Sequence, residues 1–509
     1  MRFKMVACGL GLLVTEVTAV PISGDAENSE FTPLENANHI FNAIYDSVRQ
    51  WGSSYHHNGM SFFLATVPED TQLYHGGSTP NPLNGLGWMA FEPEHAMVFA
   101  RPKRGPHGPH GSNKEQFLLP ADGSSSAGWF QTYRTAKDLR LVYVDGMSGG
   151  KSDLGTLDSQ DRILFNDTIT ESNGRFADDQ RARAVCEIAK SEWDNRIDGV
   201  LRMEAGFEII LCNPELNLHL VSSIQVTEES DTTEISGSPR PPLGPPLTRG
   251  RRPGRPGKGP GGYGPNEWVR AITSRYHGIG GGRVVLNYDY FVTAYNTSLD
   301  LFPSGAKLPR LDHIPQRYLL PIRNYVTDMV LSHTPEESGV NWQAIGDMIV
   351  NKYASFLRDL AVNRTKGTES INQGRHLQSK ISTFLSPFID RTSRNPRDQI
   401  HRCATQFVNS PAENSSLAHQ VTFSISEHVC LTLVDLVHET DYDTMLATLQ
   451  QLMEYLDWSI WKECNGCAGN EFCAIPIWPM GSKEDYEHPN CQKFDSAYAN
   501  GNDYWGRMH

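Results

Sequence analysis

A proline- and glycine-rich stretch near the middle of the chain limits what can fold around it. Residues 236–265 read SGSPRPPLGPPLTRGRRPGRPGKGPGGYGP. Proline lacks a backbone donor, and glycine loses more conformational freedom on folding than any other residue, so this density of both cannot form a packed core. We expect an extended, disordered linker between a domain over residues 28–230 and a second domain over 266–509. The length of 509 residues agrees, because it exceeds what one ordinary hydrophobic core serves.

The charged residues of the linker are all basic. They are Arg240, Arg249, Arg251, Arg252, Arg255 and Lys258. A solvated spacer is the simplest interpretation, and two alternatives stay open: processing at Arg251–Arg252, or contact with an anionic cell wall or membrane surface. The whole chain has a net charge of −14, which favours solubility and argues against a general nucleic-acid binder.

The first residues have the pattern of a signal peptide over residues 1–19. Arg2 and Lys4 precede a short apolar run, and Val17 and Ala19 stand at the spacing of a cleavage site before Val20. The apolar run is too short to span a bilayer comfortably, so we expect no stable membrane insertion. The predicted location is extracellular, after secretion.

The cysteines fit an oxidising compartment. Of nine, only Cys8 lies in the predicted signal peptide, which leaves an even number for disulfides. We expect Cys186 to pair with Cys212, and Cys403 with Cys430, because each pair stays within one domain. Four glycosylation sequons agree with the same secretory route: Asn166, Asn296, Asn363 and Asn414.

The tail holds four further cysteines: Cys464, Cys467, Cys473 and Cys491. One CxxC raises the question of zinc, but structural zinc sites normally show a second ligand pair, which is missing here. We therefore expect two disulfides and no bound metal over residues 464–491. Their pairing is left open, since sequence alone does not fix it.

The two domains differ in their expected secondary structure. Ser61–Val67, Leu139–Gly146 and Phe207–Cys212 are short, apolar and rich in aromatic or β-branched residues, which predicts strands. Segments with helical spacing lie between them, so the first domain is predicted to be α+β. In the second, apolar residues recur at helical spacing, as in residues 341–363, which predicts a mostly helical domain without a catalytic signature.

Two segments imitate functional motifs. Gly146–Ser152, GMSGGKS, resembles a phosphate-binding loop but is one residue short between its first glycine and the Gly-Lys pair. We expect a turn-rich loop there, with Asp145, Lys151 and Asp158 free for structural or substrate contacts. His107 and His110 lie in a Gly/Pro-rich loop, where two histidines bind metal weakly at best.

Three other segments form a more informative constellation. In TQLYHGG, a strand-like run ends in His75-Gly76. In GLGWMAFEPEHAMVFAR, an aromatic strand with Trp88 and Phe91 leads into a helix that begins at a proline. In RMEAGFEIILC, Glu208 enters an apolar strand.

In this order, the three segments resemble the ADP-ribosyltransferase fold, in the branch with a His-Tyr-Glu triad. The resemblance implies that His75 holds the ribose of NAD and that the Gly76 backbone holds the nicotinamide amide. Trp88 or Phe91 would stack on the nicotinamide ring, in place of the family's tyrosine. Glu208 would stabilise the oxocarbenium-like transition state, because a placed carboxylate stabilises positive charge where it develops.

The resemblance implies an NAD-consuming enzyme, either a transferase or a glycohydrolase, with a small-molecule or protein substrate. Arginine-modifying members carry Gln or Glu two residues before the catalytic glutamate, where this chain has Gly206. The whole chain also resembles a group of secreted fungal proteins of unknown function, which supports the two-part layout but supplies no activity.

Two other functions stay open. One is a secreted hydrolase acting on glycans, with two of Glu204, Glu208, Asp145 and Asp158 as its carboxylates; such a pair must lie about 5–9.5 Å apart. The other is a non-catalytic cell-wall or surface-binding protein. A shared fold would not decide among them.

Overall fold

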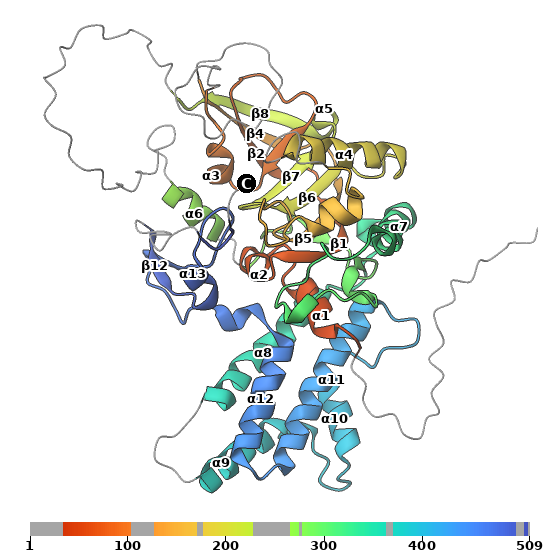
Figure 1. The fold of residues 1–509 in the computed structure, drawn as a ribbon, viewed down its shortest axis with the longest axis vertical. Coiled ribbons are helices and arrows are strands. Elements are labelled where there is room, and N and C mark those ends of the chain that lie inside the picture. The colour runs from red at the N-terminus through yellow and green to blue at the C-terminus, as the bar shows by residue number, and fades with distance from the viewer. Residues whose placement is uncertain are drawn as a thin grey trace, which may run out of the picture.

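The computed structural model describes residues 34–102, 127–169, 177–227, 265–273, 277–362, 370–494 and 503–506. Several predictions from sequence lie outside these residues. They are the signal peptide at 1–19, the linker up to residue 264 with Arg251–Arg252, the loop with His107 and His110, and the sequon at Asn363. In Figure 1 the described residues form a sheet-rich part above a bundle of long helices.

A ten-stranded mixed sheet forms the first part, in the order β10-β1-β5-β6-β7-β3-β2-β4-β8, with β9 also paired to β1. Among the strands that the structure describes, only β5 and β6 run parallel to each other, and α4 lies in the connection between them. The strands are β1 (Asn58–Val67), β2 (Gln72–Gly77), β3 (Gly87–Ala90), β4 (Trp129–Thr135), β5 (Leu139–Gly146), β6 (Gly199–Met203), β7 (Phe207–Leu211), β8 (Leu218–Gln225), β9 (Val285–Leu286) and β10 (Val292–Thr293).

The central strands are apolar runs because both faces of the sheet are covered. Every residue of β1, β6 and β7 is buried. The helices in and around the sheet are α2 (Gln50–Tyr55), α3 (Pro93–Met97), α4 (Asp178–Ser191), α5 (Pro214–Asn217), α6 (Pro265–Thr273) and α7 (Gln316–Ser332), with short helical turns at Ser159–Leu164, Ala294–Asn296, Pro303–Gly305 and Pro335–Glu337.

The second part is a helical bundle. It contains α1 (Ala37–Tyr45), α8 (Trp342–Val362), α9 (Ser370–Leu385), α10 (Pro396–Ala404), α11 (Leu417–His438) and α12 (Tyr442–Leu456), with turns at Ser386–Phe388 and Ser459–Lys462. Among the described residues, α11 is the one helix long and apolar enough to cross a membrane. It packs against α1, α8, α9, α10 and α12, and this central position explains its apolar composition.

The α+β part and the mostly helical part are confirmed. However, some segments on each side of the linker pack in the part formed mainly by the other side. β9 and β10 come after the linker in sequence, and both pair with β1. In the opposite direction, α1 precedes the sheet in sequence and packs on α8 and α11. The region 266–509 is therefore less uniformly helical than its sequence pattern predicts. The domain boundary at the linker stays a prediction.

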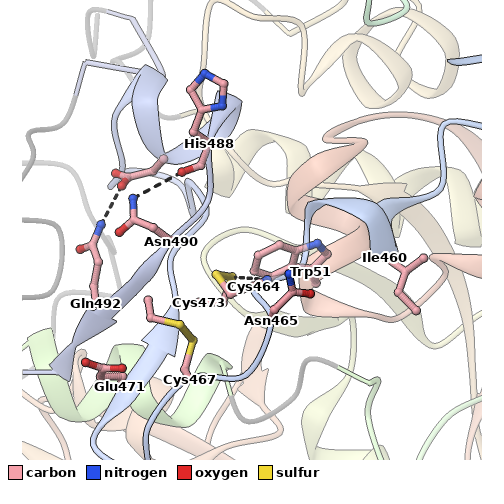
Figure 2. The surroundings of a disulfide bond; sticks show 12 residues. Trp51, Ile460, Cys464, Asn465, Cys467, Glu471, Cys473, His488, Asn490 and Gln492 are labelled. Atoms are coloured by element: carbon pink, nitrogen blue, oxygen red, sulfur yellow. Dashed lines mark hydrogen bonds between the residues drawn. A yellow bond between two sulfur atoms is a disulfide. The ribbon is translucent and has the colours of Figure 1, made fainter. Parts of the chain in front are cut away.

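All eight cysteines outside the predicted signal peptide form disulfides. The expected bonds Cys186–Cys212 and Cys403–Cys430 are confirmed. In the tail, the bonds are Cys464–Cys473 and Cys467–Cys491, beside a small hairpin of β11 (Glu471–Cys473) and β12 (Cys491–Lys493), with α13 (Lys483–Glu487) between them (Figure 2).

The two tail disulfides lie close together. Ligand atoms of Cys464, Cys467 and Cys491 lie within 4.8 Å of one another, a spacing that a metal ion could bridge. Each sulfur is already bonded to another sulfur, whereas zinc binds the thiolate form. This arrangement is therefore a disulfide framework, and the absence of metal stays a prediction.

Candidate functional site

The three segments of the constellation lie on neighbouring strands. Tyr74 of β2 is paired with Ala90 of β3, and Ala90 is paired with Glu208 of β7. The strand that carries Trp88 thus stands between the strand that ends in His75-Gly76 and the strand that begins near Glu208. The short β2–β3 pairing leaves an opening there, over which α3 packs.

A small pocket occupies this opening. His75, Gly76, Trp88 and Glu208 all line it. Its volume is about 20 Å³, which is room for about one water molecule. Phe91 lies outside the pocket: it is fully buried in the core, with the Arg283 guanidinium 5.6 Å from the centre of its ring. The structure thus brings together four of the five predicted site residues.

The wall is completed by residues that were not predicted as site residues, which are Tyr74, Met89, Ala90, His95, Ala96 and Phe99. The Ala-x-x-aromatic pattern of Ala96 and Phe99 was visible in the sequence. Ala96 and Phe99 are three residues apart and so share a face of α3 and the turn after it. Phe99 is therefore a second aromatic ring, besides Trp88, that faces the pocket.

His75 is fixed and uncharged. Its Nδ1 lies 2.8 Å from the carbonyl oxygen of Trp88, and its side chain is buried. Burial lowers the pKa of His75, although the bond to Trp88 opposes this, so the imidazole is neutral at pH 7. A carbonyl oxygen only accepts hydrogen bonds, so Nδ1 carries the proton and Nε2 is left as an acceptor.

Gly76 lets helix and strand meet at the pocket. A Cβ atom at this position would lie 2.0 Å from the carbonyl oxygen of Ala96 and 2.7 Å from the backbone nitrogen of Ala100. Any other residue would push α3 and the turn after it away from β2. The glycine thus sets the depth of the pocket.

Glu208 is one member of a buried ionic network. Its Oε1 accepts a hydrogen bond from Nε of Arg202 at 2.8 Å, and the Arg202 side chain is fully buried. Arg202 also approaches Asp178 at 3.2 Å and Glu204 at 3.7 Å. Lys151 bridges these two carboxylates, at 2.5 Å from each. Removing one partner of such a network is costly, because it leaves a buried charge uncompensated.

Burial and the charges of the network shift the pKa values of its carboxylates. Burial raises the pKa of Glu204, and the carboxylates of Glu208 and Asp178 add to the rise, while Lys151 and Arg202 oppose it. The pKa of Asp178 is lowered instead: burial raises it, but Lys151 and Arg202 outweigh that effect. Lys151 lies in the motif that imitates a phosphate-binding loop, and it points into this network with only 7% of its side chain exposed.

Each of the four carboxylates proposed for glycan hydrolysis forms an ion pair or accepts a hydrogen bond. Glu204 and Glu208 both contact Arg202. Asp145 accepts a hydrogen bond from the backbone of Ser61, and burial raises the pKa of Asp145 to about 7. Asp158 accepts from Arg310 at 3.0 Å and from the backbone of Leu311 at 2.8 Å.

Comparison with known proteins gives relatives without an assigned activity. A family model described as the YPL277C N-terminal domain matches residues 30–128 and 110–240. The uncharacterized protein YOR389W of Saccharomyces cerevisiae is 23% identical over 89% of this chain and 84% of its own length. The uncharacterized protein YPL277C of the same yeast is 29% identical over 41% of this chain and 46% of its own length. No solved structure matches.

These matches support a relationship to an uncharacterised fungal protein family, as the sequence suggested. The family model covers β1 to β8 with the pocket, and the match to the first relative extends over 89% of the chain. An ADP-ribosyltransferase domain is not among the matches.

Proposed function

We propose that this chain is a secreted NAD-consuming enzyme, an ADP-ribosyltransferase or an NAD glycohydrolase, with its site in the pocket between β2, β3 and β7. One observation carries the proposal. His75 and Glu208 are more than a hundred residues apart in sequence, yet they line one pocket together with Gly76 and Trp88. The resemblance to the transferases required this convergence, and it is not a consequence of local sequence.

The polar groups of the pocket suit the sugar end of the substrate. Nε2 of His75 makes no hydrogen bond to any residue that the structure describes, so it can accept one from a ribose hydroxyl, since Nδ1 donates to Trp88. Glu208 has one oxygen on Arg202, and its Oε2 makes no hydrogen bond within the described part of the chain. This second oxygen is the one that would face the developing positive charge on the ribose.

The pocket is smaller than a nicotinamide ring as it stands. About 20 Å³ holds a water molecule, not a heterocycle. Trp88 and Phe99 line the pocket and are only partly buried, so they are the side chains that must turn aside on binding. Their aromatic faces would then pack against the ring, since offset-stacked aromatic pairs are favourable.

Secretion is supported by the cysteines. Four disulfides use all eight cysteines beyond the predicted signal peptide, which is the usage of an oxidising compartment. The sequon residues Asn166, Asn296 and Asn414 are exposed, as glycan acceptors must be.

The test is nicotinamide release from NAD by the full chain, made in a secretory host, in wild type and in Glu208→Gln. The substitution keeps the shape of the side chain and removes its charge. We expect wild type to release nicotinamide and the variant to be slower by about 10²–10³-fold. Glu187→Gln, at an exposed position on α4, is the matched control and should leave the rate unchanged.

Stability must be measured alongside, because Glu208 also compensates Arg202. The unfolding midpoint separates a lost reaction from a lost fold. Wild type that releases no nicotinamide, or a folded Glu208→Gln variant that is as fast as wild type, would refute the proposal. The first result would favour a non-catalytic surface protein.

A further inference from the structure

A second and larger cavity of the described chain lies away from the proposed site. Its volume is about 380 Å³, within the range of small-molecule sites. It opens between the segment around β10 and α7, and residues that line it include Tyr290, Thr293, Asn296, Tyr325, Asp328 and Ser332. The NAD proposal uses none of these residues.

Two aromatic rings face solvent at this cavity. Tyr290 is 43% exposed and lies flat on His333, with ring centres 3.7 Å apart and planes 9° from parallel. Tyr325 of α7 is 60% exposed. Large rings left open on a cavity wall offer flat apolar surface to a ligand.

The polar groups select the chemistry of that ligand. Asp328 is exposed and makes no hydrogen bond or ion pair within the described residues, so its carboxylate is free to accept from hydroxyl or amide groups. Ser332 and Asn296 add further polar groups, while no lysine or arginine is among the described lining residues. An anionic ligand is therefore disfavoured, and a neutral ring rich in hydroxyl groups fits best.

The wall of the cavity includes a glycosylation sequon, whose asparagine is an attachment site for such a sugar ring. Asn296 is followed by Thr297 and Ser298, which completes a glycosylation sequon, and Asn296 is exposed. The other exposed sequons differ from it. Asn166 uses its side-chain oxygen to accept a hydrogen bond from Gln316, and Asn414 does not line the cavity.

We propose that Asn296 is glycosylated and that its first N-acetylhexosamine lies in this cavity, against Tyr325 and within reach of Asp328. Nδ2 of Asn296 gives up one proton and bonds the anomeric carbon of an oligosaccharide donor, whose diphosphate carrier leaves. The proposal rests on the secretory route and is independent of NAD chemistry.

The test combines peptide mass mapping with thermal unfolding. Mapping of protein from a glycosylating host should find an N-acetylhexosamine on Asn296. Asn296→Gln and Tyr325→Ala should each lower the unfolding midpoint by about 1 °C, which corresponds to an interaction of the order of 1 kcal/mol in a chain of this size. The double variant should fall no further than either single one, because both remove the same contact.

Two controls isolate the glycan. Asn414→Gln, at an exposed sequon away from the cavity, should not move the midpoint. In protein refolded from a host that does not glycosylate, Asn296→Gln should have no effect either. An unmodified Asn296, or additive effects of the two variants, would overturn the proposal. Stabilisation of the unglycosylated protein by free N-acetylglucosamine, without any effect of Asn296→Gln in the glycosylated protein, would overturn it in favour of an external sugar.

Discussion

His56 is held between two carboxylates that lie far apart in the sequence, each at the end of a helix of the bundle. Its Nδ1 lies 2.7 Å from Asp46, just after α1, and its Nε2 lies 3.2 Å from Asp457, at the end of α12. Burial lowers the pKa of His56, but the hydrogen bonds to Asp457 and Asp46 outweigh this and raise it to about 10. The imidazolium therefore ties the start of the sheet-rich part to the helical bundle.

This ion triad predicts a loss of stability at alkaline pH. The folded pKa of about 10 lies above the ordinary value of 6.5, so the contribution is full below pH 6.5 and is lost as pH rises towards 10. We expect the midpoint of denaturant unfolding to fall over this window in wild type. His56→Gln should cost about 1.5–3 kcal/mol at pH 6, as for hydrogen bonds to charged groups.

The comparison of variants separates His56 from other groups. Burial raises the pKa of Asp145 to about 7, which also lowers stability as pH rises, but this effect is complete soon after pH 7. The difference between wild type and His56→Gln should therefore shrink mainly between pH 7 and 10. A difference that is constant over this range would contradict a charged His56.

Gly76 gives a second prediction at the scale of one residue. Gly76→Ala places a methyl group against the Ala96 carbonyl, so α3 must shift, and we expect a loss of about 1–3 kcal/mol, as for overpacking. Gly339→Ala is the control, because a Cβ there meets no atom within 4 Å. Urea unfolding of both variants measures the difference. Equal stability of the two would mean that α3 is not packed on β2 as described.

The members of the candidate site were predictable to different degrees. His75, Gly76 and Glu208 stand in short motifs, so a single sequence sufficed to single them out. The pairing of Glu208 with Arg202 is local and could be anticipated, since the two residues face each other across the β6–β7 hairpin. The contacts of Lys151 with Asp178 and Glu204 could not be found in this way, because they depend on tertiary packing between distant segments.

At the scale of the elements, apolar strands of four or more residues were visible in the sequence, and the two-residue strands were not. The segment expected over Ser61–Val67 is the C-terminal part of β1, which begins at Asn58. β9 and β10 have two residues each, too few to show an alternating pattern, and they exist only because β1 offers an edge to pair with. The formation of these two strands therefore depends on tertiary contacts and not on local sequence.

The Cys186–Cys212 disulfide supports the strand that carries Glu208. It joins α4 to the residue directly after β7 and closes a loop with a sequence separation of 26. Replacing both cysteines with alanine should lower the free energy of unfolding by about 2–4 kcal/mol. Hydrogen exchange of the β7 amides should also become faster.

The tail disulfide Cys467–Cys491 is the matched control, with a sequence separation of 24. Removing it should loosen the tail and leave exchange in β7 unchanged. If both double variants speed exchange in β7 equally, the effect is global unfolding, and the local role of Cys186–Cys212 is wrong.

At the scale of the whole molecule, the two sides of the linker hold each other by backbone pairing and by side-chain contacts. β9 and β10, from beyond the linker, pair with β1. On the bundle side, Asn42 of α1 donates a hydrogen bond of 2.9 Å to the carbonyl of Leu456 in α12. One apolar core contains residues from both sides, for example Phe62 and Leu433.

This interlocking predicts that a cut at Arg251–Arg252 leaves the two halves bound to each other. After limited cleavage by a trypsin-like protease, we expect the two fragments to elute together in native size-exclusion chromatography, because separation would break the β1–β9 and β1–β10 pairing and expose shared core. In denaturant without reductant they should separate, since every disulfide lies on one side of the cut. Uncut protein in the same denaturant is the control. Two peaks under native conditions would instead establish two independently folded domains, each with its own core.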